Sequence, residues 1–473
     1  MPRRTTSRTG GALPLLRLTL TEPNLLDRIS GRAHARSSTP AKFGPLRYAG
    51  GINRSVLIPS RRQTLPHLAW LAVILLMPVA LLNYLDRQML AAMKYSVMAD
   101  IPSVGSEENW GFMLGQFKWV YALLSPFGGY VADRFSRRLA ICGSLFVWSA
   151  VTWWTGHVTS SGELLMARSL MGISEAFYIP AALALIADYH TGATRSRAVG
   201  LHQMAIYAGV IVGGFGGYVA DAPALGWRSA FDACGAIGML YALPLVLLLR
   251  DVPKSEDILM KQTVSPARAA AELLTNIYFV LLVLYFTLPA LAGWVVRDWM
   301  PAILKQQFDI GQGKAGVAAT LYWQVAAVVG AVAGGWLADR WMRRNVRGRI
   351  FVSAIGMGFI VPAIFGVGNA ASLAVAVAFL FLFGLGWGFF DCNNMPILCQ
   401  IVGPELRATG YGVMNLVSIS CGGLADWGFG TLRDRHVPLN VIFGTFASAA
   451  IISIVLVLLI RPRKELIDQE LAQ

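Results

Sequence analysis

The residues of this chain that could do chemistry are charged side chains that interrupt long apolar stretches. A charge in hydrocarbon costs at least ~2.5–3.5 kcal/mol on insertion scales, so each is expected to face a cavity or a charged partner. Arg168 and Glu175 are separated by close to two helical turns, which places both on one helix face. The whole set comprises Asp86, Arg87, Lys118, Arg168, Glu175 and Asp391.

Carboxylates beside guanidinium groups in such a setting suit proton transfer. A poorly solvated carboxylate takes up a proton readily and an adjacent Arg opposes this, so a change of partner can load or release a proton. Arg keeps its charge and offers a planar fork of donors that suits a carboxylate or phosphate. We predict that Asp86 and Glu175 carry protons. Arg87 and Arg168 are predicted to exchange carboxylate partners or to bind an anionic substrate.

Three more residues complete the predicted site as substrate ligands or as members of an ion-pair switch: Lys118, Asp391 and His202. A structural role is the alternative for His202, because a satisfied histidine in an apolar segment needs no ligand. Arg297 and Asp298 are expected at the outer membrane interface, where long side chains can reach water. For the whole set, the alternative is a static ion-pair network that only fixes helix packing.

Twelve apolar segments must hold these residues in place. The chain is 55% hydrophobic and 14% charged, with a mean hydropathy of +0.55, whereas soluble proteins carry about 25% charged residues. Each segment is long enough to cross roughly 30 Å of hydrocarbon as a helix. We predict an all-α polytopic membrane protein with twelve transmembrane helices in two pseudo-symmetric six-helix halves. The segments fall near residues 67–96, 109–131, 139–158, 163–188, 198–219, 227–249, 276–302, 314–337, 349–367, 371–399, 409–430 and 438–460.

The chain divides into five predicted parts. Residues 1–65 form a basic arm, rich in Arg, Ser and Pro, that is expected to be disordered and to take no part in the function. The arm also has the Arg-rich, acid-poor composition of an organelle transit peptide. Residues 66–249 and 274–460 are the two halves, 250–273 is a polar cytoplasmic linker, and 461–473 is a cytoplasmic tail.

The net charge of +14 is concentrated in the arm and in short loops on one side of the predicted membrane. The first loop on the other side holds Asp100, Glu107 and Glu108 and no base. By the positive-inside rule both termini are cytoplasmic, and we expect a bacterial inner membrane. The loop near Arg433 and Arg435 is the exception to the bias. Such a distribution does not indicate a nucleic-acid-binding face.

Several classes of function lack their sequence signals. We find no nucleophile elbow, no HExxH motif and no phosphate-binding loop. The five cysteines lie in apolar segments without a CxxC pair, so neither a disulfide framework nor a zinc site is expected. We therefore expect no enzyme, no metal and no cofactor, with a proton gradient as the driving force. The expected partners are the lipid bilayer and a small-molecule or lipid-like anionic substrate, not nucleic acid, and a monomer is expected.

A ten-residue motif occurs twice, about half a chain apart. Residues 129–138 read GYVADRFSRR and residues 335–344 read GWLADRWMRR. Glycine allows close helix approach, and an Asp at the end of a span can pair with Arg. We predict that the two copies form a cytoplasmic gate, with a purely topogenic Arg cluster as the alternative. The predicted gate residues are Gly129, Asp133, Arg134, Arg137 and Arg138, and Gly335, Asp339, Arg340, Arg343 and Arg344.

The repeated motif resembles the loop signature of the major facilitator superfamily, with Ser136 where that signature has Gly. The stretches NYLDR (83–87), RSLMGISEAFYIPAALALIADYH (168–190) and GWRSAF (226–231) resemble the spinster branch. NYLDRQ and GQFKWVYAL (115–123) also resemble the anion:cation symporter branch, although Lys118 departs from both. Both resemblances imply a proton-coupled transporter of anionic substrates.

These observations predict a secondary active transporter that works by alternating access, with two halves rocking about a central site. The resemblance leaves two substrate classes open: lysolipids or sphingoid phosphates, exported by a spinster-type protein, and sugar acids or other carboxylates in symport with protons. A glycine run in the fifth segment resembles an antiporter signature that lacks its Pro, and close helix packing explains it equally well. A non-transporting sensor of the same fold is the further alternative.

Overall fold

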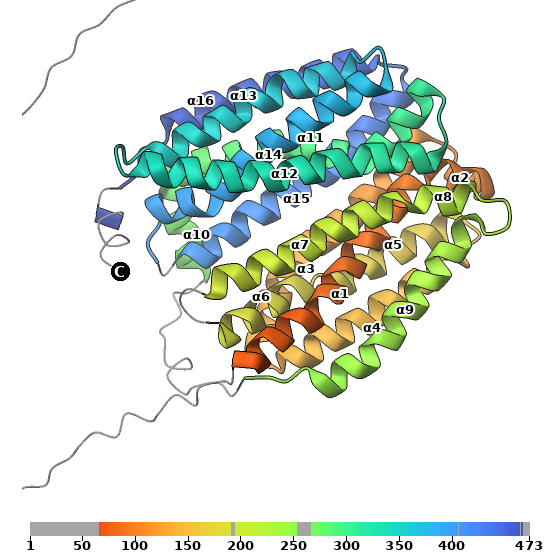
Figure 1. Ribbon diagram of the computed structural model, residues 1–473, viewed down its shortest axis with the longest axis horizontal. Coiled ribbons are helices and arrows are strands. Elements are labelled where there is room, and N and C mark those ends of the chain that lie inside the picture. Colours follow the sequence, from red (N-terminus) through yellow and green to blue (C-terminus); the bar gives the residue numbers. More distant parts are fainter. Residues whose placement is uncertain (1–65, 191–193, 253–265, 405, 464, 467–473) are drawn as a thin grey trace, which may run out of the picture. The chain divides into compact units, whose positions relative to one another are not determined.

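The computed structural model describes residues 66–190, 194–252, 266–404, 406–463 and 465–466. The predicted basic arm, most of the linker and most of the tail lie outside these residues. All regular structure in the described part is helical, which confirms the all-α fold. Figure 1 shows two groups of long helices, one from each half of the sequence.

The first group of helices comprises α1 (Pro66–Ala92), α2 (Lys94–Asp100), α3 (Glu107–Arg134), α4 (Arg137–Thr155), α5 (Ser161–Glu175), α6 (Tyr178–Tyr189), α7 (Arg195–Gly214), α8 (Gly216–Asp221) and α9 (Gly226–Leu248). A short 3₁₀ turn, η1 (Pro102–Val104), lies between α2 and α3. The second group comprises α10 (Pro266–Thr275), α11 (Ile277–Phe308), α12 (Gln312–Met342), α13 (Gly348–Gly368), α14 (Leu373–Ile401), α15 (Arg407–Asp434) and α16 (Leu439–Leu459).

Every one of the twelve predicted segments coincides with helix. In the described part of the chain, nine helical stretches are long and apolar enough to cross a membrane. Helices α3, α4 and α15 match the remaining three segments but contain more polar residues. Helix α10 occupies the end of the predicted linker and begins at Pro266, where the missing N–H costs nothing in a first helical turn.

The fourth predicted span is broken into α5 and α6 at Ala176 and Phe177. Pro180 lies in the first turn of α6 and has no N–H to donate to the carbonyl of residue 176. That carbonyl lies against Gly128 of α3, where a Cβ atom would approach it to 2.4 Å. The break therefore directly follows Glu175, the last residue of α5.

Glycines form the seams along which the two halves meet. Helix α3 packs on α15, and α7 and α8 pack on α12. A Cβ atom at Gly111 of α3 would lie 2.3 Å from the Asp426 carbonyl, and one at Gly217 of α8 would lie 2.4 Å from the Gln312 backbone. Backbone therefore touches backbone across both seams, as small residues allow between membrane helices.

The glycine run of the fifth segment serves two different contacts. Gly209 and Gly213 pack against α1 within the first half, whereas Gly214 and Gly217 pack against α12 of the second half. Helix packing therefore accounts for this run, which is one of the two explanations that the sequence left open.

Replacing Gly217 by Ala is expected to weaken the seam between the halves, because the added methyl group meets the backbone of residue 312. The variant should unfold at a lower temperature in a thermal melt of the purified protein. Gly200→Ala is the control, since a Cβ at Gly200 meets nothing within 4 Å. That change should be neutral or stabilising by up to about 1 kcal/mol through helix propensity. Equal melting temperatures for the two variants would show that the close approach at Gly217 does not stabilise the contact between the halves.

Candidate functional site

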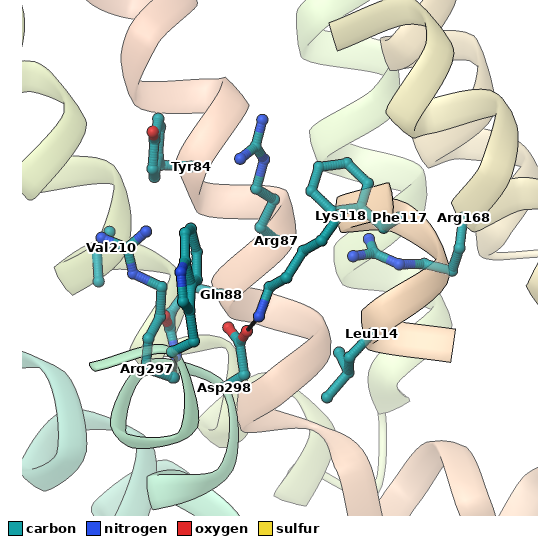
Figure 2. A pocket seen from close by; sticks show the side chains of 11 residues that line it. Tyr84, Arg87, Gln88, Leu114, Phe117, Lys118, Arg168, Val210, Arg297 and Asp298 are labelled. Carbon is teal, nitrogen blue, oxygen red and sulfur yellow. Dashed lines mark hydrogen bonds and ion pairs between the residues drawn. The ribbon is translucent and has the colours of Figure 1, made fainter. Parts of the chain in front are cut away.

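A small cavity of about 20 Å³ lies where the two halves meet, among α1, α3, α5, α7 and α11. Cationic and aromatic side chains dominate its walls. Figure 2 shows the long Lys118 side chain reaching Asp298, with Arg168 on one side and Arg297 on the other. The lining residues that carry charge or an aromatic ring are Tyr84, Arg87, Phe117, Lys118, Arg168, Trp294, Arg297 and Asp298.

The predicted proton carriers lie beside this cavity on the side of the first half. Arg87 Nε donates a hydrogen bond of 2.6 Å to Glu175 Oε2, and a second guanidinium nitrogen forms an ion pair with the same oxygen. Asp86 Oδ2 accepts a hydrogen bond of 3.1 Å from Thr152 Oγ1. The Asp86 and Glu175 side chains are buried. The structure thus brings Glu175 to Arg87, not to Arg168 on its own helix.

Arg168 completes this group without a direct carboxylate contact among the described residues. Its guanidinium carbon lies 4.5 Å from the centroid of the Phe117 ring, and that of Arg87 lies at the same distance. Glu175 and Asp86 are its main electrostatic partners. Two guanidinium groups around one aromatic ring leave donors available for an anion in the cavity.

Lys118 has two carboxylate partners, both from the second half. Its Nζ lies 2.5 Å from Asp298 Oδ2 and forms a second ion pair with Asp426 Oδ2. The expectation that Arg297 and Asp298 lie at the outer interface is wrong, since both line the cavity. Their helix, α11, extends beyond them to Phe308, so the membrane interface lies further along the chain.

Asp426 was missed in the sequence, although its signal was present. It is an acidic residue inside the apolar segment 409–430, and the rule that selected Asp86 selects it equally. In the structure it is fully buried on α15. Its partner on the other half, Lys118, was the residue that departed from both family resemblances.

The two other predicted site residues lie outside the cavity lining. Asp391 of α14 is accessible to solvent, and its electrostatic neighbours are Arg297, Tyr207 and Tyr411 from three other helices. His202 is buried in the first half, with its Nε2 2.9 Å from the Tyr178 hydroxyl. That partner satisfies the ring and favours the structural interpretation of His202.

The first copy of the repeated motif is tied to its own half. Arg137 forms an ion pair with Asp188 and donates to the Ala184 carbonyl at 3.0 Å. Ser136 caps α4 by accepting from the Leu139 backbone N–H, and it donates to Asp251. Ser136 thus has a local function where the family signature has Gly. The side chain of Asp133 and any contact at Gly129 lie outside the described part of the structure.

The second copy behaves in the same way. Asp339 pairs with Arg349 at 3.1 Å, and Arg340 lies over the Trp336 ring, all within the second half. The ion pairs described for residues 134–138 and 335–344 each join side chains of one half. The function of the motif as a gate stays a prediction.

The halves are joined instead at the opposite end by two reciprocal helix caps. Asp434, at the end of α15, accepts hydrogen bonds from the backbone N–H groups of Glu107 and Glu108 at 3.1 and 2.8 Å. Asp221, at the end of α8, accepts from Gly313 N at 3.0 Å and from Gln312 Nε2 at 3.0 Å. Each half therefore caps a helix N-terminus of the other, where a carboxylate is most favourable.

Charged groups in the described residues do not gather as a metal site would require, since no three His, Cys, Asp or Glu side chains lie close enough to hold an ion. What the arrangement can do is bind an anion among arginines, exchange ion-pair partners and move one half against the other. These are the capacities of a carrier.

Comparison with known proteins agrees with this geometry. The family model of the Major Facilitator Superfamily matches residues 76–425. The chain belongs to this superfamily. A superfamily efflux pump of Mycolicibacterium smegmatis is 28% identical over 378 residues, which cover 78% of this chain and 85% of the pump. Protein spinster of Drosophila melanogaster is 25% identical over 395 residues, 80% of this chain but only 64% of that protein.

A solved structure shares the fold. The bacterial homolog of the human lysosomal transporter spinster, crystallised in an inward-facing and unoccupied conformation, superposes with a TM-score of 0.67 at 21% identity. The match covers 83% of this chain and 95% of that chain. The resemblance to the spinster branch is thus confirmed, and the relatives of this superfamily member are transporters, not enzymes.

We call the end at which the Asp221 and Asp434 caps join the halves the closed end. Removing either cap is expected to weaken the contact between the halves at this end. Asp221→Ala and Asp434→Ala should each raise the open fraction about fivefold, because a lost cap costs about 1 kcal/mol. The measurement is the labelling rate of Thr320→Cys, a buried seam position, by a membrane-impermeant maleimide in a background without native cysteines. Asp251→Ala, whose bonds stay within the first half, is the control. Unchanged labelling in both cap variants would show that the two caps do not hold the halves together.

Proposed function

We propose that this superfamily member is a proton-coupled transporter of an organic anion or anionic amphiphile. The observation that carries the proposal is the cavity between the halves, which Arg87, Arg168 and Arg297 line. Three permanent cations around one cavity create a site for a carboxylate or phosphate group, which the planar guanidinium fork matches.

The Arg87–Glu175 ion pair supports a coupling of anion and proton. An incoming anion competes with Glu175 for Arg87, and a buried carboxylate that loses its cation is stabilised by taking up a proton. Asp86 lies on the same helix as Arg87 and is the second predicted carrier. Proton uptake and anion binding then occur together, with no unpaired charge left in the membrane.

The closed end gives the proposed direction of access. If the basic loops face the cytoplasm, as the positive-inside rule predicts, the Asp221 and Asp434 caps close the outer side. The described state then corresponds to the inward-facing half of an alternating-access cycle. We propose a bacterial inner-membrane location, cytoplasmic termini and a monomeric transporter.

The aromatic lining favours an amphiphilic or aromatic anion over a small sugar acid. Tyr84, Phe117 and Trp294 lie next to the arginines, with Leu114 and Val210 completing an apolar wall. An apolar body can pack on this wall while its anionic group meets the guanidinium groups.

The proton carriers are tested by neutral isosteres. Asp86→Asn and Glu175→Gln should abolish pH-gradient-driven flux in proteoliposomes, because neither side chain can then exchange a proton. Asp232→Asn is the control, since this half-buried aspartate of α9 pairs with His157 within the first half and lies outside the cavity. Full gradient-driven uptake in both variants would overturn the coupling. If no anion crosses the membrane even in the wild type, the alternative of a sensor gains support.

The substrate class is tested by a thermal-shift screen that sets sugar acids and aromatic acids against lysolipids and sphingoid phosphates. A true ligand at 100 times its dissociation constant should stabilise the wild type by about 2.7 kcal/mol. Arg168→Lys should weaken the effect at least about tenfold in affinity, since an ammonium group cannot replace the fork. A shift only with sugar acids would favour the carboxylate symporter, and an unaltered shift in Arg168→Lys would remove Arg168 from the site.

A further inference from the structure

One charged cluster near the cavity has no function in the proposed exchange at Arg87 and Glu175. We define the triad as Lys118, Asp298 and Asp426. Lys118 Nζ lies 2.5 Å from Asp298, forms an ion pair with Asp426, and lies 4.3 Å from the centroid of the Trp294 ring. Lys118 and Asp426 are buried, with side-chain exposures of 4% and 0%, and Asp298 has 12%.

The triad differs from the Asp86–Arg87–Glu175 group in how it lies across the fold. Asp86, Arg87 and Glu175 all belong to the first half, so a rigid rocking of the halves leaves their distances unchanged. Lys118 belongs to α3 of the first half, whereas both aspartates belong to α11 and α15 of the second. Rocking that parts α3 from α15 must separate the ammonium group from its carboxylates.

The α3–α15 seam shows that this separation belongs to the closed end. Gly111 lies two turns before Lys118 on α3 and touches the backbone of Asp426 itself. Further along the seam, Asp434 caps α3 at Glu107 and Glu108. Opening that end therefore exposes the triad to the water on the same side.

The closed triad holds one carboxylate more than its cation can neutralise. Other cations face it across the cavity: Arg87 of α1, Arg168 of α5 and Arg297 of α11. Arg87 is paired with Glu175, Arg168 has Glu175 and Asp86 as its main partners, and Arg297 interacts with Asp391 of α14. None of these three arginines pairs directly with Asp298 or Asp426 among the described ion pairs, so Lys118 is the one cation in contact with both carboxylates.

The position of the two aspartates indicates how the excess is resolved. Asp298 Oδ2 and Asp426 Oδ2 both contact Lys118 Nζ, so the two carboxyl groups meet at a single ammonium group. Like charges held this close favour one shared proton, which lets one carboxyl group donate a hydrogen bond to the other.

We propose that Lys118, Asp298 and Asp426 form a second proton-binding site, which spans the two halves and binds its proton in the closed state. The proton, taken from water, forms an O–H bond on one aspartate that donates to the other. When α3 leaves α15, the aspartates and Lys118 are each hydrated separately and the proton returns to water. The site rests on the proposed function only in requiring that the halves rock.

The sign of the pH dependence follows from linkage. The closed state binds one more proton than the open state, so acid favours closure and rising pH favours opening. For one linked proton, the open-to-closed ratio changes by up to about tenfold per pH unit.

The test is a distance measurement by electron paramagnetic resonance, without substrate or transport. Spin labels are placed at Ala224→Cys and Asn440→Cys, two exposed positions at the closed end, one in each half, in a background without native cysteines. In nanodiscs, the long-distance population should grow as the pH is raised from about 4 to about 9, a range that begins near the ordinary titration of an aspartate.

Matched variants assign the effect. Asp426→Asn imitates the protonated aspartate, so the labels should stay close at every pH. The change of the open-to-closed ratio per pH unit should shrink at least about threefold, because most of the one linked proton is lost. Asp298→Asn should do the same and serves if Asp426→Asn does not fold. Asp232→Asn should retain the wild-type response. Glu175→Gln should also retain the pH response of the label distances that comes from the triad, because Glu175 moves with Asp86 and Arg87 in one half.

Two outcomes would overturn the proposal: a wild-type pH response in both aspartate variants, or distances that follow Na⁺ concentration at constant pH. If Glu175→Gln abolishes gradient-driven flux but keeps the pH response of the label distances, the result supports the triad as a separate proton-binding site. Normal flux in Glu175→Gln with a lost response in Asp426→Asn would refute the coupling proposed above and support the triad.

Discussion

The structure depends on one constraint: a charge that leaves water must keep a partner. Arg87 with Glu175, and Lys118 with Asp298 and Asp426, meet it by pairs that cross between helices. Breaking a buried pair by removing one partner costs about 3–5 kcal/mol. Such a pair is therefore either permanent or exchanged for another in a single step. A carrier needs the second property, because its ligand can replace a partner only at the moment when the ion pair opens.

Glycine seams and helix caps make such exchange mechanically possible. Along the seams, Gly111 and Gly217 bring backbone against backbone, and Gly423 and Gly313 accept the rings of Trp119 and Tyr218 from the other half. Glycine thus lets the halves approach closely at many points without a branched side chain that would have to move out of the way. At the closed end, Asp221 and Asp434 supply attraction that is directional but accessible to water. Water can replace each of these hydrogen bonds when the halves separate, so the two caps do not prevent the halves from separating.

Duplication explains the mechanical parts of the molecule better than it explains the site. The reciprocal caps come from corresponding helices of the two halves, as do the paired seams and the repeated basic motif. The charged groups at the cavity do not follow this symmetry. The Arg87–Glu175 pair lies entirely in the first half, and Lys118 of that half faces two aspartates of the other. A symmetric frame thus carries an asymmetric set of charged groups.

The sequence alone determined the helical fold, the position of every long helix and the grouping of Asp86, Arg87, Arg168 and Glu175 near the centre. These follow from local rules, since hydrocarbon demands apolar helices and penalises each isolated charge wherever it occurs. Only the tertiary structure decided which charges are partners. Glu175 meets Arg87 on another helix, and Lys118 meets Asp298 and Asp426 of the other half. Partner choice depends on how helices far apart in the chain pack, and glycine contacts set that packing at a range that no sequence window contains.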